Sequence, residues 1–141
     1  VTDSQLTLIN ATVHGSGGTG VQIVSTPAVV ANSILFQNLA GDLQDDGSSS
    51  SVTFNLLGDL SPAGEDANFT GNPGFVDPQN LDFALTEDSD AVDRGTHTVS
   101  LATVDLDFHR RVVDGDGDGA KEHAGRDPHP DRFADSRDPG T

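Results

Sequence analysis

The chain has 141 residues, a formal net charge of −16 at pH 7, and no Cys, Met, Trp or Tyr. This length suits one domain, and the lack of Cys excludes disulfides and thiolate metal sites. No apolar run reaches the roughly 18 residues that a membrane-spanning helix needs. So negative a chain repels nucleic acids and anionic membranes and attracts cations.

Charge is distributed unevenly along the chain. Residues 1–93 contain 13 acidic side chains and no Lys or Arg, whereas residues 94–141 contain 10 acidic and 7 basic side chains. Two explanations are compatible with each other: a solvated acidic surface of the kind that a high-salt habitat favours, and carboxylates that hold Ca²⁺. No initiating Met and no signal peptide are visible, which predicts either a processed secreted protein or a piece of a longer one.

A repeat organises the first half of the sequence. Asn10, Asn32 and Asn55 each follow a strand-like run and precede an apolar pair, and their spacings are 22 and 23 residues. A fixed period of this size is typical of a solenoid, although three Asn could share such a spacing by chance. In stacked coils, Asn side chains in register form a hydrogen-bonded ladder, and Asn tolerates the left-handed backbone of a bend. The three Asn are therefore predicted to form one ladder.

The remaining pattern supports about three coils in residues 1–67. The Gly-rich segment 15–20 is predicted to be a turn, because it lacks the Gly-Lys-Ser/Thr ending of a phosphate-binding loop. Residues 41–51 are polar and are predicted to be a loop outside the stack. The expected strands are Leu6–Ile9, Thr12–Val13, Val21–Val24, Ala28–Ala31, Ile34–Phe36, Val52–Phe54 and Leu56–Leu57.

A more specific pattern begins at Asn68. Residues 71–77 read Gly-Asn-Pro-Gly-Phe-Val-Asp, residues 82–85 read Asp-Phe-Ala-Leu, and residues 89–95 read Ser-Asp-Ala-Val-Asp-Arg-Gly. This series resembles the C-terminal closing segment of secreted bacterial right-handed parallel β-helix proteins of the pectate-lyase-like superfold, with Asp90 where their pattern has Pro. The resemblance implies an all-β fold: a short right-handed parallel β-helix, a capping segment over residues 68–104, and an Asp/Gly-rich tail over residues 105–141.

The closing segment has the composition of a cap. Phe75, Phe83 and Leu85 can cover the open end of the last coil, while Pro73 and Pro78 prevent further strand pairing. No equivalent is visible at the N-terminal side of the repeat. We therefore expect an open apolar edge there, which upstream coils or another molecule would cover.

The strongest chemical signal is the run from Asp114 to Gly119. Asp114, Asp116 and Asp118 occupy positions 1, 3 and 5 of a calcium-type loop, with Gly at position 6 and Glu122 at position 9. Position 12 is Gly, so the usual bidentate acid is missing, and a solvated Asp-Gly linker is the alternative. The resemblance adds an upstream acidic pair. The predicted Ca²⁺ ligands are Asp105, Asp107, Asp114, Asp116, Asp118 and Glu122.

These features predict a structural protein and not an enzyme. Fold relatives include polysaccharide lyases and hydrolases, but residues 1–93 offer no Lys or Arg base and no pair of acids distinguished by spacing. We expect a secreted, extracellular, Ca²⁺-stabilised module that self-associates into a surface polymer or filament by end-to-end stacking of coils. The alternative is a carbohydrate-binding or carbohydrate-cleaving fragment of a larger surface protein, for which aromatic Trp or Tyr platforms are missing.

Overall fold

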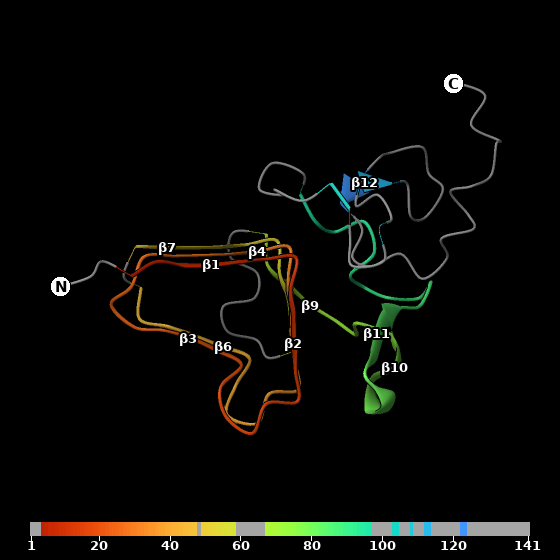
Figure 1. Ribbon diagram of the computed structural model, residues 1–141, viewed down its shortest axis with the longest axis horizontal. Helices are drawn as coiled ribbons and strands as arrows, with labels where there is room; N and C mark the ends of the chain where they lie inside the picture. Colours follow the sequence, from red (N-terminus) through yellow and green to blue (C-terminus); the bar gives the residue numbers. More distant parts are fainter. Residues whose placement is uncertain are drawn as a thin grey trace.

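The computed structural model describes residues 4–47, 49–58, 67–96, 103–104 and 108, and the backbone of residues 112–113 and 122–123. In this part of the chain the fold is all-β, and helix is confined to one short turn (Figure 1). The elements are β1 (Leu6–Ile9), β2 (Thr12–His14), β3 (Val21–Ile23), β4 (Ala28–Ala31), β5 (Ile34–Phe36), β6 (Leu43–Asp45), β7 (Ser50–Thr53), β8 (Leu56–Leu57), β9 (Phe69–Thr70), β10 (Phe75–Asp77), the 3₁₀ helix η1 (Pro78–Asn80), β11 (Asp82–Leu85), β12 (Val112–Val113) and β13 (Glu122–His123).

Three sheets of parallel strands form the body of the molecule. Sheet A has the order β1-β4-β7, sheet B the order β2-β5-β8-β9, and sheet C the order β3-β6. Each strand pairs with the strand 22 residues further on, as Leu6 with Ala28 and Val21 with Leu43 show. We call one passage through the three sheets a round: β1, β2 and β3 make the first round, β4, β5 and β6 the second. Figure 1 shows the first two rounds superposed along the same three-sided path.

The strands surround an apolar interior. Val30, Leu35 and Leu57 are 0 % exposed and come from sheets A and B, and Ile23 and Leu43 reach the same cluster from sheet C. Alternate residues of a strand point to opposite faces, so each round sends one set of side chains inward. Complete burial of an aliphatic side chain of this size contributes about 1.5–3 kcal/mol to the free energy of unfolding.

Sheet B is buried on both of its faces. In β5, Leu35 points into the interior, whereas Ile34 and Phe36 belong to a second apolar cluster on the other face. That cluster also contains Leu56 and Phe69 of sheet B, and Phe75, Leu85, Ala91 and Val92 cover it. Strands with two buried faces are expected to be apolar at nearly every position, as Ile34-Leu35-Phe36 is.

The closing segment therefore packs against the side of the stack and not over its end. The prediction that Phe75 and Leu85 cover the end of the last coil is wrong, because both contact the cluster on the outer face of sheet B. Pleating explains the difference: every second residue of sheet B points outward and offers an apolar surface several strands wide. The fourth strand of that sheet, β9, lies within the residues that the sequence assigns to the capping segment.

The bend between sheets A and B, which we call the A–B corner, differs from the prediction by one residue. Asn10 and Asn32 have φ values of 56° and 50°, and Phe54 and Ala67 occupy the same left-handed position in the next two passages. Asn55 lies one residue later than this position. The predicted ladder of Asn10, Asn32 and Asn55 is thus wrong, because the pairing of sheet A repeats every 22 residues and places Asn32 opposite Phe54.

A ladder does form at the next position of the A–B corner. The side chain of Ser33 accepts a hydrogen bond from the backbone nitrogen of Ala11 (3.2 Å), and that of Asn55 accepts one from Ser33 (3.0 Å). Asn68 continues the series by accepting from the nitrogen of Asn55 (3.0 Å). Each ladder side chain thus binds the backbone of the preceding passage.

The polar segment 41–51 is not wholly a loop outside the stack. Leu43–Asp45 forms β6 and pairs with Val21–Ile23, and β7 begins at Ser50. The buried Leu43 takes the interior position opposite Val21. Backbone pairing and one inward apolar residue are sufficient for a strand here, although most side chains of the segment are polar.

Candidate interaction surface at the first-round edge

The three strands of the first round each lie at the edge of their sheet in the described part of the chain. Leu6 and Asn10 donate backbone hydrogen bonds to the second round, as do Gly15 and Val21. Bonding direction alternates along a parallel strand, so the residues between them direct their N–H and C=O groups away from the stack. These outward-bonding residues are Thr7, Ile9, Thr12, His14 and Gln22. We call this edge, formed by β1, β2 and β3, the first-round edge.

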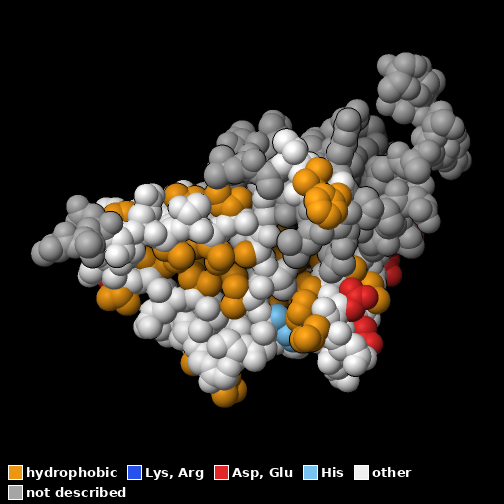
Figure 2. Space-filling view, in the orientation of Figure 1, with side chains coloured by type: hydrophobic (Ala, Val, Ile, Leu, Met, Phe, Trp, Pro, Cys, Tyr) orange, Lys and Arg blue, Asp and Glu red, His pale blue; other side chains and the backbone are white. Residues whose placement is uncertain are grey.

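Apolar side chains lie inside this edge. Leu6, Leu8 and Val13 pack on the interior cluster but stay half-buried, whereas their counterparts deeper in the stack are buried. Figure 2 shows hydrophobic side chains gathered on the face bounded by β1, β2 and β3, with the acidic side chains of this view at the side of the β10–β11 hairpin. The first-round edge therefore combines open backbone groups with apolar surface.

The first-round edge is also free of formal charge. Residues 4–41, which include the first round and most of the second, contain no Asp, Glu, Lys or Arg in a chain with 23 acidic residues. The first-round strands contain no Pro either. Natural proteins usually protect an exposed strand edge with charges, Pro or bulges. The sequence carried this signal, but it becomes visible only when the charges are mapped onto the rounds.

A buried polar network holds the turn between sheets B and C. Asn38 donates from its side chain to Asp42 (2.7 Å) and to the carbonyl of Val13 (3.0 Å), and its oxygen accepts from the nitrogen of Ser16 (2.9 Å). Asn38 and Asp42 are 7 % and 3 % exposed. Gly20 packs directly against both. The network joins the Gly-rich turn of the first round to the second round, which explains the Gly-rich segment without a bound phosphate.

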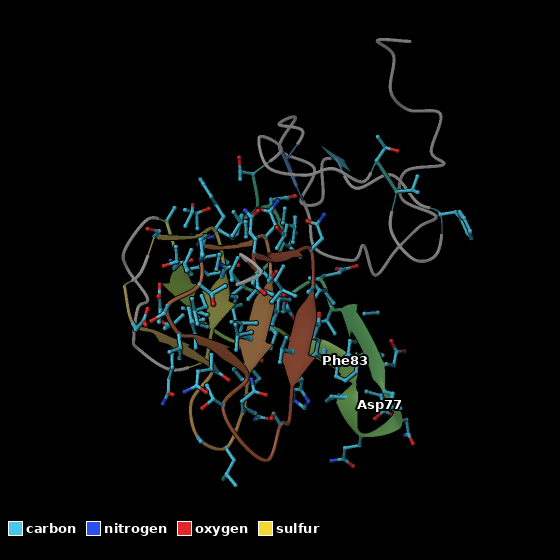
Figure 3. All side chains as sticks on the ribbon, turned by 60° about the vertical axis from the view of Figure 1, so that its left-hand side comes forward. Asp77 and Phe83 are labelled. Atoms are coloured by element: carbon cyan, nitrogen blue, oxygen red, sulfur yellow. The ribbon has the colours of Figure 1, made fainter. Side chains whose placement is uncertain are left out.

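His14 lies where the first-round edge meets the β10–β11 hairpin. Its ring is 5.6 Å from that of Phe75 and 5.4 Å from that of Phe83, and it stacks on Phe36 at 6.4 Å. The Nε2 atom of His14 is 3.2 Å from the side-chain oxygen of Gln37. In Figure 3, Phe83 lies between the hairpin and the stacked strands, and Asp77 lies at the outer end of the hairpin. The hairpin thus contacts the stack up to the first round.

Most of the predicted Ca²⁺ ligands lie outside the described residues. This holds for Asp105, Asp107, Asp114, Asp116 and Asp118, while Glu122 is described only by its backbone, in β13. The side chains that the structure does describe contain no group of three His, Asp or Glu that could hold a metal ion.

Two described strands flank the Asp-Gly run. Strands β12 and β13 are antiparallel, and Val113 pairs with Glu122. Residues 114–121 therefore start and end at one paired position, as a hairpin loop does.

Comparisons with protein-family models, with curated proteins and with solved structures found no match to this chain. Among the residues that the structure describes, no helix is long and apolar enough to cross a membrane.

Proposed function

We propose that this chain is a right-handed parallel β-helix module with a structural, non-catalytic role outside the cell. Parallel pairing at a constant repeat of 22 residues in three sheets supports the β-helix assignment. The resemblance of residues 68–95 to the closing segment of secreted β-helix proteins supports the location. Self-association through the first-round edge is the activity that we assign to the module.

The observation that carries this proposal is the uncharged first-round edge. Unpaired backbone groups on a strand edge form a template for another strand, and association buries the half-exposed Leu6, Leu8 and Val13. A like edge completes the backbone hydrogen bonds of all three sheets at once. No comparable arrangement of acids and bases for catalysis stands out among the described residues.

Ca²⁺ enters the proposal as a stabiliser of the tail. Asp114, Asp116, Asp118 and Glu122 supply the hard oxygen ligands that Ca²⁺ prefers, and Asp105 and Asp107 supply two more. The pairing of Val113 with Glu122 brings the two ends of the Asp-Gly run together. Bound Ca²⁺ would also offset part of the repulsion among the carboxylates of this acidic chain.

Size in solution tests the proposed function. Light scattering and negative-stain microscopy of the full chain, with Ca²⁺ and with a chelator, are expected to reveal particles larger than one chain whose stability falls on chelation. A monomer at high protein concentration in Ca²⁺ would refute self-association. A monomer that binds glycans on a panel would instead support the alternative, a carbohydrate-binding fragment.

A further inference from the structure

The two ends of the stack have different shapes in the described part of the chain. At one end, sheets A, B and C all start in the first round, so β1, β2 and β3 form one even rim. At the other end, sheet A ends at β7, sheet B at β9 and sheet C at β6, which belong to different passages. An even rim of three strands matches another even rim better than it matches this stepped end.

The corner ladders also begin at the first-round edge. Each ladder side chain accepts a hydrogen bond from the preceding passage, but Ala11 has only a methyl group at this position. In the turn between sheets B and C, the hydroxyl of Ser16 already accepts from the nitrogen of Gly18 (3.2 Å). A further round stacked in parallel on this edge would therefore find no acceptor at Ala11 and an occupied one at Ser16.

Antiparallel pairing of two first-round edges avoids this deficit, because it uses backbone groups alone. The outward-bonding residues Thr7, Thr12 and Gln22 carry exposed, uncharged side chains. Two chains with a net charge of −16 each repel one another, and the repulsion is smallest where their uncharged faces meet. The acidic hairpins then lie away from the shared edge.

We propose that two copies of this chain pair through their first-round edges about a two-fold axis and form a closed dimer. The proposal rests on the proposed function, in which this edge is the site of self-association, and it replaces an open polymer by a pair. An isologous interface of this kind uses the same surface on both subunits and leaves no first-round edge for a third copy.

Sedimentation equilibrium on the full chain gives the first test. Over concentrations from about 1 to about 500 μM, a single monomer–dimer equilibrium is expected, with no larger species. Added NaCl screens the repulsion between the two acidic chains, so the dissociation constant is expected to fall as the salt concentration rises.

A matched pair of substitutions locates the interface. Thr7 and Ser51 occupy the same register position at opposite ends of sheet A, since both pair with Val29, and both side chains are exposed. Thr7→Lys places a charge on the first-round edge and is expected to raise the dissociation constant at least tenfold. Ser51→Lys adds the same charge at the other end of the sheet and is expected to leave it unchanged. Circular dichroism verifies that both variants keep the parent's fold.

Each outcome decides between the proposals. A dimer that Thr7→Lys alone weakens supports two-fold pairing. Oligomers that keep growing with concentration, and that both substitutions block, overturn the two-fold dimer but retain self-association. A dimer that neither substitution affects uses another surface and overturns the inference. A monomer under all conditions overturns both the inference and the proposed function.

Discussion

The side-chain oxygen of Asn55 lies 3.0 Å from the backbone nitrogen of Ser33 and accepts its hydrogen bond. The amide nitrogen of the same side chain donates to the carbonyl of Val30 and to the side chain of Asn68, both at 2.9 Å. Asn55 is 0 % exposed. Its amide group thus connects three passages of the chain at the A–B corner.

Asn55→Ala is expected to lower the free energy of unfolding by about 2–4 kcal/mol, because it leaves the buried groups of Ser33 and Val30 without partners. Urea denaturation followed by circular dichroism measures the change. Asn80→Ala is the control, since Asn80 bonds Asp77 on the exposed hairpin surface and its loss is expected to cost at most about 0.5 kcal/mol. Equal losses in the two variants would contradict a structural role of the ladder.

The Gly-rich turn offers a second test. A Cβ atom at Gly20 would lie 2.6 Å from the side-chain nitrogen of Asn38 and 2.7 Å from the carbonyl oxygen of Asp42. Gly20→Ala is therefore expected to cost about 1–3 kcal/mol through displacement of the buried network. Gly17→Ala, in the same turn, meets nothing within 4 Å and is expected to leave the stability almost unchanged. Thermal unfolding curves that shift equally for both variants would refute this explanation of Gly20.

Ala67 occupies the left-handed position of the A–B corner with φ of 62° and is exposed. Asn10 and Asn32 take this position in the first two rounds, and Asn tolerates it better than Ala does. We expect Ala67→Asn to raise the free energy of unfolding by about 0.5–1 kcal/mol. Ala40→Asn, at an exposed residue outside this conformation, should give no gain in the same denaturation assay.

The aromatic contacts of the hairpin predict how firmly it binds to the stack. The ring of Phe83 is 5.4 Å from that of His14 and 5.2 Å from that of Phe75. Phe83→Ala is expected to destabilise the protein by about 1–3 kcal/mol, less than for a fully buried Phe. The control is Leu81→Ala in the same hairpin, because Leu81 is 77 % exposed. Differential scanning calorimetry should separate the two variants clearly.

Calcium binding is tested on the tail by isothermal titration calorimetry. The double substitution of Asp114 and Asp116 by Asn is expected to weaken Ca²⁺ binding at least about tenfold, since it removes two charged ligands. The matched control replaces the adjacent Asp45 and Asp46, which bond Ser50 and Ser25. If the control lost binding and the tail variant kept it, the Asp-Gly run would be a linker.

Part of the fold follows from the sequence. The strands of the first round and β4 and β5 lie where the apolar alternation predicts them, to within one residue at their ends. Inward and outward alternation is a local property, so residues 6–36 reveal it directly. Strand β6 was missed because its pairing with β3, and not its polar side chains, makes it a strand.

Other features could not be derived from local pattern. The ladder was assigned one residue too early because Asn55 attracts attention at a spacing of 23, while the equivalent position of the second round is occupied by Ser33. The position of the closing segment depends on which face of sheet B is left open, which is a tertiary property. The candidate interaction surface emerged only when the charge-free stretch of residues 4–41 was placed on the edges of three sheets.

The double burial of sheet B has a consequence for the fidelity of folding. When one face of a strand is polar, a slip by one residue exposes apolar side chains to water and is penalised at once. A slip of Ile34-Leu35-Phe36 would exchange apolar for apolar, so hydrophobicity alone cannot reject the misaligned chain. The side chains of Asn55 and Asn68 can, because their amides find the nitrogens of Ser33 and Asn55 at one alignment only. These two amides act as a proofreading device for strand alignment.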